Sequence, residues 1–326
     1  MIEGRVAELH QLIEEEIKRH RYGETPDSLY EPIRYIMSLG GKRIRPLLVL
    51  MAYELFDKDP KEIVSQAVAV ELFHNFTLMH DDIMDRAPIR RGKPTVHEKW
   101  GDNTAILSGD VMMVKSYELF LESGVSNLKE ILSFFNTCAV EVCEGQQLDM
   151  DFETRTEVTE AEYLEMIRLK TAVLLGFSMR LGAMMAGAGN NPSKLLESFA
   201  MNIGVGFQLM DDMLDVFGDA SKFGKQEGGD IIANKKTYLL IEALEKANPE
   251  ERKTLDFWLN VTEFDPAEKV RAVKTVYNQI GIPELSRIKM NEYFDLGLNK
   301  LDQLEIHDER KLPLRNFIDA LIRRDH

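Results

Sequence analysis

The sequence of 326 residues has very few cysteines. Only Cys138 and Cys143 are present, and no histidine or cysteine spacing around them is typical of a zinc site. Two thiols five positions apart do not form the disulfide framework of a small secreted domain. The cysteine content therefore predicts reduced thiols in a cytoplasmic protein.

Long apolar runs are also missing. The nearest candidate, at 171–189, is interrupted by Arg180, and no uncharged stretch reaches the ~18 residues that a membrane span requires. The first residues do not combine a basic start with an apolar segment, as a signal peptide does. We expect no integral membrane segment.

Positive charge is scarce, because 40 Lys and Arg stand against 55 Asp and Glu, a net charge of −15. This balance argues against binding to nucleic acids or anionic membranes, which need a basic surface. A local basic cluster can still bind a small anion. Apolar residues make up 44% of the chain, enough for a sizeable core, which argues against extensive disorder.

Strand signals are scarce as well, and the hydrophobic pattern is helical nearly throughout. Helix starts are predicted at Asp59, Thr159 and Asn191, where capping residues precede long apolar segments. These segments run ~25 residues each and are apolar on most faces, which is typical of central helices in a bundle. With no low-complexity linker in between, the sequence predicts a single all-α domain over residues 1–326.

The pattern DDxxD occurs twice, at 81–85 and 211–215, each time at the end of a long apolar segment. On a helix, the first and fifth residues of the pattern share a face, so two carboxylates repel each other there. A hard divalent cation relieves this repulsion, and Mg²⁺ commonly binds one or two carboxylates together with substrate phosphates. A solvated acidic helix end is the alternative for one copy. Two copies that face each other predict a metal-mediated clamp for a diphosphate.

Three basic clusters accompany the acidic patterns, at 40–45, 86–94 and 223–235. The first follows a glycine pair that allows close backbone approach, and its arginine forks suit phosphate oxygens. Basic residues beside metal-binding acids indicate that a polyanion lies between them. Charge balancing at the surface remains the alternative for any one cluster.

Three polar residues stand in apolar surroundings. His74 lies seven residues before Asp81 on the same helix face, and its spacing alone leaves a core histidine and a ligand equally open. Lys170 lies in a segment that should be buried, where a lysine is costly unless it is paired or its head reaches solvent. Gln208, three residues before Asp211, is similarly polar in an apolar run.

Together these residues resemble the trans-isoprenyl diphosphate synthases, or polyprenyl synthetases, of the short-chain type. The shared motifs are Gly-Gly-Lys-Arg-x-Arg-Pro at 40–46, His74, the first DDxxD with Arg90-Arg91-Gly92, Lys170-Thr171, the glycine-rich run into the second DDxxD at 204–215, and the loop at 224–237. The resemblance implies a helical bundle around a deep central cavity, typically a homodimer. It also implies head-to-tail condensation of isopentenyl diphosphate with an allylic diphosphate through an allylic carbocation, with about three Mg²⁺ ions as cofactor.

The resemblance further implies a role for each site residue. The metal ions would be bound by Asp81, Asp82, Asp85, Asp211 and Asp215. The allylic diphosphate would contact Arg90, Lys170 and Lys235, with help from Lys225. Isopentenyl diphosphate would bind at Gly41, Lys42, Arg45, His74 and Arg91. Thr171 and Gln208 would stabilise the cation beside Lys170, and the departed diphosphate would take the proton.

Product length is assigned, also by resemblance, to Phe76 and Thr77, which precede the first DDxxD. An aromatic residue at this place resembles enzymes with fifteen- or twenty-carbon products, so we expect geranylgeranyl diphosphate, with farnesyl diphosphate next. On an ideal helix Phe76 lies about 140° round from Asp81. Phe73, Met79 or residues of other helices therefore remain alternatives for the cavity floor.

Two other classes of protein stay open beside the prenyltransferase. A terpene cyclase of similar fold usually replaces the second aspartate motif and lacks the cluster that binds isopentenyl diphosphate. A non-catalytic regulatory subunit commonly loses an aspartate motif. Both DDxxD motifs and the 40–45 cluster are intact in this sequence, which favours the prenyltransferase.

Overall fold

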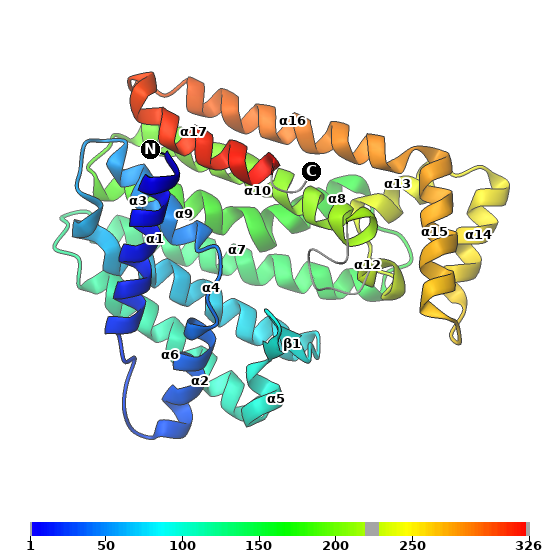
Figure 1. Ribbon diagram of the computed structural model, residues 1–326, viewed down its shortest axis with the longest axis horizontal. Helices are drawn as coiled ribbons and strands as arrows, with labels where there is room; N and C mark the ends of the chain where they lie inside the picture. The colour runs from blue at the N-terminus through cyan, green and yellow to red at the C-terminus, as the bar shows by residue number, and fades with distance from the viewer. Residues whose placement is uncertain (1, 219–227, 324–326) are drawn as a thin grey trace. The chain divides into compact units, whose positions relative to one another are not determined.

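The computed structural model describes residues 2–218 and 228–323. Within these residues the regular elements are helices, apart from one two-stranded hairpin (Figure 1). This confirms the predicted all-α class. The described residues fall into two compact units: unit 1 takes in 2–137, 177–197 and 304–318, and unit 2 takes in 138–176, 198–303 and 319–323. That residues 1–326 form one domain stays a prediction.

Unit 1 is organised around one buried helix. Its own elements are α1 (Ile2–Arg19), α2 (Asp27–Ser38), α3 (Ile44–Glu54), η1 (Pro60–Ile63), α4 (Val64–Met84), β1 (Ile89–Arg90), β2 (Lys93–Pro94), α5 (Val96–Trp100) and α6 (Asp102–Leu121). Helix α4 lies alongside α6 and is also contacted by α1, α2, α3 and α5 (Figure 1). Neighbours on so many sides explain why its sequence is apolar on most faces.

The start of this central helix is close to the prediction. The side chain of Asp59 accepts a hydrogen bond from the backbone N–H of Lys61 at 3.0 Å, as an N-cap does. The first turn, η1, is a tighter 3₁₀ turn, and α4 continues from Val64 to Met84. The first DDxxD therefore forms the last turn of a buried helix.

Aromatic rings fill part of the core of unit 1. We call Phe73, Phe120, Phe135 and Phe177 the aromatic cluster. The ring of Phe135 lies 5.0 Å from Phe73, 4.9 Å from Phe120 and 5.4 Å from Phe177, at interplanar angles of 49° to 77°. Tilted and edge-on packing of this kind adds ~0.5–1.5 kcal/mol per pair to the burial of apolar surface.

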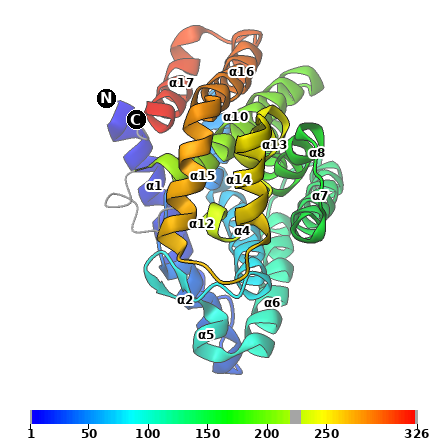
Figure 2. The same ribbon diagram turned by 90° about the vertical axis from the view of Figure 1, so that its right-hand side faces the viewer.

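Unit 2 has its own helices and its own core. Its elements are α8 (Glu160–Ile167), η2 (Arg168–Ala172, a π-helical segment), α12 (Gly229–Ile232), α13 (Tyr238–Lys246), α14 (Pro249–Asn260), α15 (Pro266–Ile280) and α16 (Ile282–Asp302). Helices α14 and α15 pack side by side, and α12 and α13 contact α15 (Figure 2). Leu239, Leu255 and Ile282 are among the fully buried residues of this core.

Four further helices contribute residues to both units: α7 (Leu128–Thr154), α9 (Val173–Met185), α10 (Asn190–Phe217) and α17 (Asp308–Arg323). The predicted capping box at Thr159 and Glu162 is present and opens α8. Helix α10 begins at Asn190, one residue before the predicted cap. None of the helices in residues 2–218 and 228–323 has the length and apolar content that crossing a membrane demands.

Candidate functional site

The first DDxxD lies at the C-terminal end of α4, and its three carboxylates differ in environment. Asp82 is only 2% exposed, whereas Asp81 is half-buried and Asp85 is exposed. Arg90 Nε donates to both carboxylate oxygens of Asp82 at 2.9 Å, and its Nη2 lies 3.6 Å from Asp81 Oδ2. Burial raises the pKa of Asp82, and Arg90 opposes that shift. The second aspartate thus faces an arginine inside unit 1.

Arg90 and Arg91 are carried by the β1–β2 hairpin. The two residues of its turn, Arg91 and Gly92, both have positive φ, at 51° and 71°, as a type I′ turn requires. Arg91 Nη1 donates to the backbone oxygen of Gly40. Gly41 has a φ of 134°, which L side chains rarely adopt, and a Cβ there would lie 2.9 Å from Arg91 Cζ. The backbone conformation at position 41 therefore favours glycine, and the guanidinium of Arg91 lies close against it.

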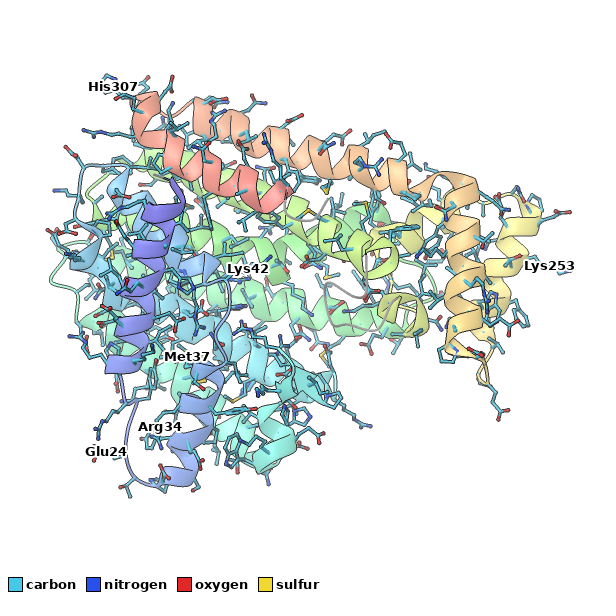
Figure 3. All side chains as sticks on the ribbon, in the orientation of Figure 1. Glu24, Arg34, Met37, Lys42, Lys253 and His307 are labelled. Carbon is cyan, nitrogen blue, oxygen red and sulfur yellow. The ribbon has the colours of Figure 1, made fainter. Side chains whose placement is uncertain are left out.

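Arg45, on α3, contacts His74, on α4, with 3.0 Å between Nη1 and Nε2. Because a guanidinium only donates, Nε2 accepts and the imidazole is neutral. Burial, followed by Arg45, Arg91 and Arg90, holds the pKa of His74 well below its usual value. Lys42 is exposed, at the loop between α2 and α3 (Figure 3). We call Lys42, Arg45, Arg90 and Arg91, together with the first DDxxD, the first cluster. Its positively charged side chains are suited to binding an anion.

Of the two residues assigned to product length, Phe76 lies beside the aromatic cluster. The ring of Phe76 lies 5.5 Å from that of Phe73 and 4.7 Å from that of His80. The hydroxyl of Thr77 donates to the backbone oxygen of His74 at 2.8 Å, within its own helix. Phe76 is therefore the one of the two that makes aromatic contacts, and its control of chain length stays a prediction.

The second DDxxD lies at a pocket of about 200 Å³ within unit 2, and we call the residues that line this pocket the second cluster. Its lining combines carboxylates with lysines and a few polar and apolar groups. The lining residues are Asp149, Tyr163, Met166, Ile167, Lys170, Thr171, Gln208, Asp211, Asp212, Asp215, Asp230, Lys235, Lys236 and Thr237. Six of the predicted site residues in the second half of the sequence thus meet in one pocket: Lys170, Thr171, Gln208, Asp211, Asp215 and Lys235.

Lys170 and Thr171 lie in the π-helical segment η2, a local widening that is frequent at functional sites. Lys170 Nζ lies 2.6 Å from Asp149 Oδ2 on α7, so this half-buried lysine is paired, as its apolar surroundings require. A Cβ on Gly145 would lie 2.2 Å from the backbone nitrogen of Lys170. The glycine therefore permits the close contact of α7 with η2.

A chain of hydrogen bonds fixes the amide of Gln208. Thr171 Oγ1 donates to Gln208 Oε1 at 3.2 Å, and Gln208 Nε2 donates to Asp212 Oδ1 at 3.1 Å. The hydroxyl of Tyr163 donates to the other oxygen of Asp212. Burial and then repulsion from Asp230 raise the pKa of Asp212 to about 8. The amide oxygen of Gln208 is thereby held next to Thr171.

The rest of the second DDxxD borders α12. Asp211 is exposed, and Asp215 Oδ2 accepts from the backbone N–H of Asp230 at 2.9 Å. The backbone N–H of Lys235 donates to the Asp230 oxygen at 2.9 Å, which places this lysine at the pocket wall. Lys225 lies outside the described residues.

Both DDxxD motifs are built alike. In each, the second aspartate is buried, at 2% exposure for Asp82 and 5% for Asp212, and both of its oxygens accept hydrogen bonds from side chains of the same unit. The reason is geometric, because neighbours in a helix point about 100° apart. The first and fifth aspartates are half-buried or exposed, and their carboxylates carry hard oxygen atoms, a donor type that fits Mg²⁺.

The sequence alone did not single out three pocket residues: Asp149, Tyr163 and Asp230. Asp149 pairs with a lysine that is distant in sequence, and only the packing of α7 on η2 brings the two together. Tyr163 carries a hydroxyl in an apolar helix, a signal that pointed to a buried partner. Asp230 follows a glycine pair after the second DDxxD, but nothing local in the sequence ties it to Asp215.

Comparison with known proteins agrees with this geometry. The chain matches the polyprenyl synthetase family over residues 26–280. A geranylgeranyl diphosphate synthase of Methanosarcina mazei is 39% identical over 303 residues, which cover 92% of this chain and 91% of that protein. A crystal structure of a geranylgeranyl pyrophosphate synthase is 43% identical with a TM-score of 0.92, covering 96% of this chain and 97% of that one.

A third protein adds information on ligands. The geranylgeranyl pyrophosphate synthase of Corynebacterium glutamicum, crystallised with isoprenyl diphosphate and magnesium, is 26% identical with a TM-score of 0.85, over 98% of both chains. The family match covers more than half of the chain, and the resemblance drawn from the motifs is confirmed. This chain belongs to the polyprenyl synthetase family.

Proposed function

We propose that this chain is a Mg²⁺-dependent short-chain prenyltransferase. It condenses isopentenyl diphosphate head to tail with an allylic diphosphate, and its main product is geranylgeranyl diphosphate, with farnesyl diphosphate as the next candidate. The observation that carries the proposal is the pairing of an acidic motif with cations in each of the two clusters. Arg45, Arg91 and Lys42 accompany the first DDxxD, and Lys170 and Lys235 share a pocket with the second.

The first cluster binds isopentenyl diphosphate in this proposal. Lys42, Arg45 and Arg91 supply the positive charge, and the arginine forks match phosphate oxygens. Neutral His74 accepts from Arg45 and so orients that guanidinium without adding charge. Burial and then Arg45, Arg91 and Arg90 depress the pKa of His74, and these three guanidinium groups form a positive environment that suits an anion.

The second cluster binds the allylic diphosphate in this proposal and faces the developing carbocation, and Arg90 is kept as the further contact that the family resemblance implies. Lys170 and Lys235 contact the departing diphosphate, which takes up the proton at the end of the reaction. The oxygen of the Gln208 amide and the hydroxyl of Thr171 present partial negative charge at fixed positions. Such preorganised dipoles stabilise charge that develops in the transition state.

The metal ligands in this proposal are the first and fifth aspartates, namely Asp81, Asp85, Asp211 and Asp215. When bound, about three Mg²⁺ ions supply electrostatic stabilisation of the leaving diphosphate. Across the described residues, no three acidic, histidine or cysteine side chains already converge on one point. In this proposal, phosphate and water oxygens complete each coordination shell, as Mg²⁺ prefers. Asp82 is the weakest ligand candidate, since Arg90 engages both of its oxygens.

The quaternary structure in this proposal is a homodimer formed through α6. Five large apolar side chains on this helix are exposed by 37% to 58%: Ile106, Leu107, Met113, Val114 and Leu121. Leu107, Val114 and Leu121 recur every seven residues and so share one face of α6, and exposed apolar surface gathered on one face marks an interaction site. Leu107→Glu with Val114→Glu should give a monomer in sedimentation velocity, whereas Ile288→Glu, at an equally exposed position on α16, should not.

The proposal is tested with the purified chain, Mg²⁺, isopentenyl diphosphate and allylic primers of five to fifteen carbons. We expect diphosphate release and a twenty-carbon product by mass. Turnover with none of these primers would leave the regulatory-subunit alternative. A cyclic hydrocarbon formed without isopentenyl diphosphate would instead indicate a terpene cyclase.

A further inference from the structure

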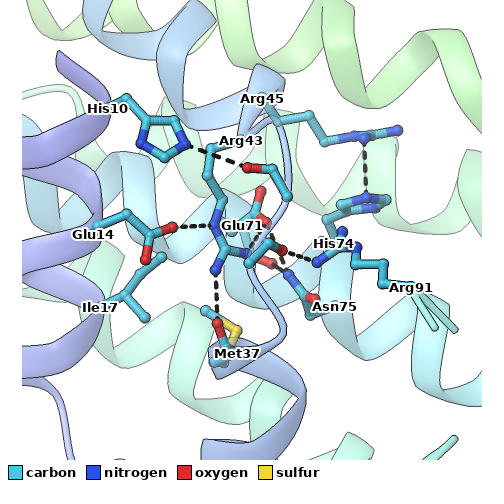
Figure 4. A network of polar contacts seen from close by, with 12 residues as sticks. His10, Glu14, Ile17, Met37, Arg43, Arg45, Glu71, His74, Asn75 and Arg91 are labelled. Carbon is cyan, nitrogen blue, oxygen red and sulfur yellow. Dashed lines mark hydrogen bonds and ion pairs between the residues drawn. The ribbon is translucent and has the colours of Figure 1, made fainter. Parts of the chain in front are cut away.

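Arg43 belongs to the basic cluster at 40–45, but its side chain points into the protein. It is 3% exposed, whereas its neighbour Lys42 is exposed. All three guanidinium nitrogens are used internally (Figure 4). Nε donates to Glu14 at 2.8 Å, Nη1 donates to Glu71 at 2.7 Å, and Nη2 donates to the backbone oxygen of Met37 at 2.6 Å. This arginine is not available to a ligand.

The charge of Arg43 is balanced where it lies. Glu71, on α4, has a side chain that is 3% exposed, and it also accepts from Asn75 Nδ2 at 3.0 Å. Removing one partner of such a buried pair leaves the other charge uncompensated. The positive charge that remains open to an anion therefore comes from Lys42, Arg45 and Arg91, and not from Arg43.

The backbone around Arg43 explains why it needs to be held. Arg43 has φ of 48°, in the left-handed region that L-residues rarely adopt, and it immediately precedes α3. Gly40 and Gly41 also have positive φ, at 73° and 134°. The loop therefore makes an unusual path between α2 and α3, and its only buried side-chain anchor is the Arg43 guanidinium. That path fixes the outward direction of Lys42. It also fixes the start of α3, which carries Arg45.

Helix α1 provides one side of the anchor. Glu14 is on α1, and His10, one turn earlier, lies 3.3 Å through Nε2 from the backbone oxygen of Gly41 (Figure 4). The family match begins at residue 26, so α1 lies outside it. A helix outside the matched region thus contacts the phosphate-binding loop at two points.

We infer that Arg43 is a positioning residue and that α1, through Glu14, sets the affinity for isopentenyl diphosphate. The inference rests on the proposed function of the first cluster. Glu14 and Glu71 hold Arg43, Arg43 holds the loop at 40–45, and the loop presents Lys42 and Arg45 to the diphosphate. Loss of Glu14 lets the loop move and lowers affinity at this cluster, while the pocket of unit 2 is untouched.

The test compares Glu14→Ala and Glu14→Gln with Glu15→Ala in the full-length protein. Glu15 is the matched control because it is exposed on the same helix and its hydrogen bond to Gln11 lies within that helix. We expect Glu14→Ala to raise KM for isopentenyl diphosphate about tenfold, as loss of a charge-assisted bond would. KM for the allylic diphosphate and kcat should stay within about twofold, and Glu14→Gln should lie between Glu14→Ala and the wild type.

Calorimetry, read together with the kinetic assay, keeps the inference separate from the proposed function. Calorimetric titration of the metal-free proteins with isopentenyl diphosphate should show the same weakening without any turnover. An inactive wild type that still binds isopentenyl diphosphate would contradict the proposed function alone. An active wild type whose Glu14→Ala variant has an unchanged KM for isopentenyl diphosphate, or loses only Tm and kcat, would overturn the inference.

Discussion

Arg90 Nε donates to both carboxylate oxygens of Asp82 at 2.9 Å, so the second aspartate of the first DDxxD holds an arginine. Asp82→Asn should then weaken binding of the allylic diphosphate through Arg90 without changing the Mg²⁺ requirement. Hydrogen bonds to charged groups contribute ~1.5–3 kcal/mol, which corresponds to a KM raised roughly tenfold to a hundredfold. The measurement is KM for the allylic substrate at several Mg²⁺ concentrations.

Asp81→Asn is the comparison for that prediction, because Asp81 occupies the outward first position of the same motif. It should raise the Mg²⁺ concentration needed for half-maximal rate. If Asp82→Asn raised that concentration as much as Asp81→Asn, Asp82 would be a metal ligand and its contact with Arg90 secondary.

The hydroxyl of Tyr163 supports Gln208 through Asp212, and Tyr163→Phe removes it while preserving the ring. The carboxyl group of Asp212 then keeps one donor, Gln208 Nε2, and is held less firmly, so the amide bonded to it is less well oriented. We expect kcat to fall about tenfold and stability to fall by ~1–3 kcal/mol. Gln208→Ala and the double variant complete a cycle, in which the two losses in kcat should be strongly non-additive. Additive losses would show that Tyr163 acts independently of the amide.

Gly145 permits the contact between α7 and η2, where a Cβ would lie 2.2 Å from the backbone nitrogen of Lys170. Gly145→Ala should therefore push the two segments apart, with a loss of ~1–3 kcal/mol in the free energy of unfolding and a loss of activity. Gly124→Ala is the control, because a Cβ at that position meets nothing within 4 Å. Equal effects of the two substitutions in urea denaturation would contradict the assignment.

Acid should destabilise the protein through His74. Its folded pKa is depressed by burial and by Arg45, so below about pH 6.5 the unfolded chain takes up a proton that the folded chain does not. The contribution of His74 to the free energy of unfolding should fall as pH decreases from 6.5 toward the folded pKa, by at most ~1.4 kcal/mol per pH unit. Asp212, whose pKa is raised to about 8, contributes in the opposite direction over the same range. Urea denaturation of the wild type and of His74→Asn at pH 7.5 and 5.5 isolates the His74 contribution as the difference between the two proteins, and His307→Gln, at an exposed position, should behave as the wild type.

Much of this fold could be predicted from local signals. The capping box at Thr159 and the N-cap at Asp59 are encoded within a few residues, and the apolar stripes of α4 and α10 follow helical periodicity. The two DDxxD motifs also indicate metal-binding chemistry from the local sequence alone, because carboxylates four residues apart share a helix face. Such features need no knowledge of the partner elements.

The directions of neighbouring charges could not be predicted in the same way. Lys42 and Arg43 are adjacent cations, yet one is exposed and the other is buried, since Glu14 and Glu71 come from helices that are distant in sequence. The pairing of Lys170 with Asp149 likewise depends on how α7 packs on η2. A sequence pattern specifies that a buried charge needs a partner, and only the tertiary structure supplies its identity.

Phe76 is the residue to which we assign control of product length. Its ring lies between those of Phe73 and His80, at 5.5 and 4.7 Å, so its removal opens space next to the aromatic cluster. If Phe76 forms the floor for the growing chain, Phe76→Ala should add at least one five-carbon unit to the main product, as measured by mass. Thr77→Ala is the matched control, because the Thr77 hydroxyl bonds to its own helix. An unchanged product distribution with Phe76→Ala would assign the floor to another residue, with Phe73 the first to examine.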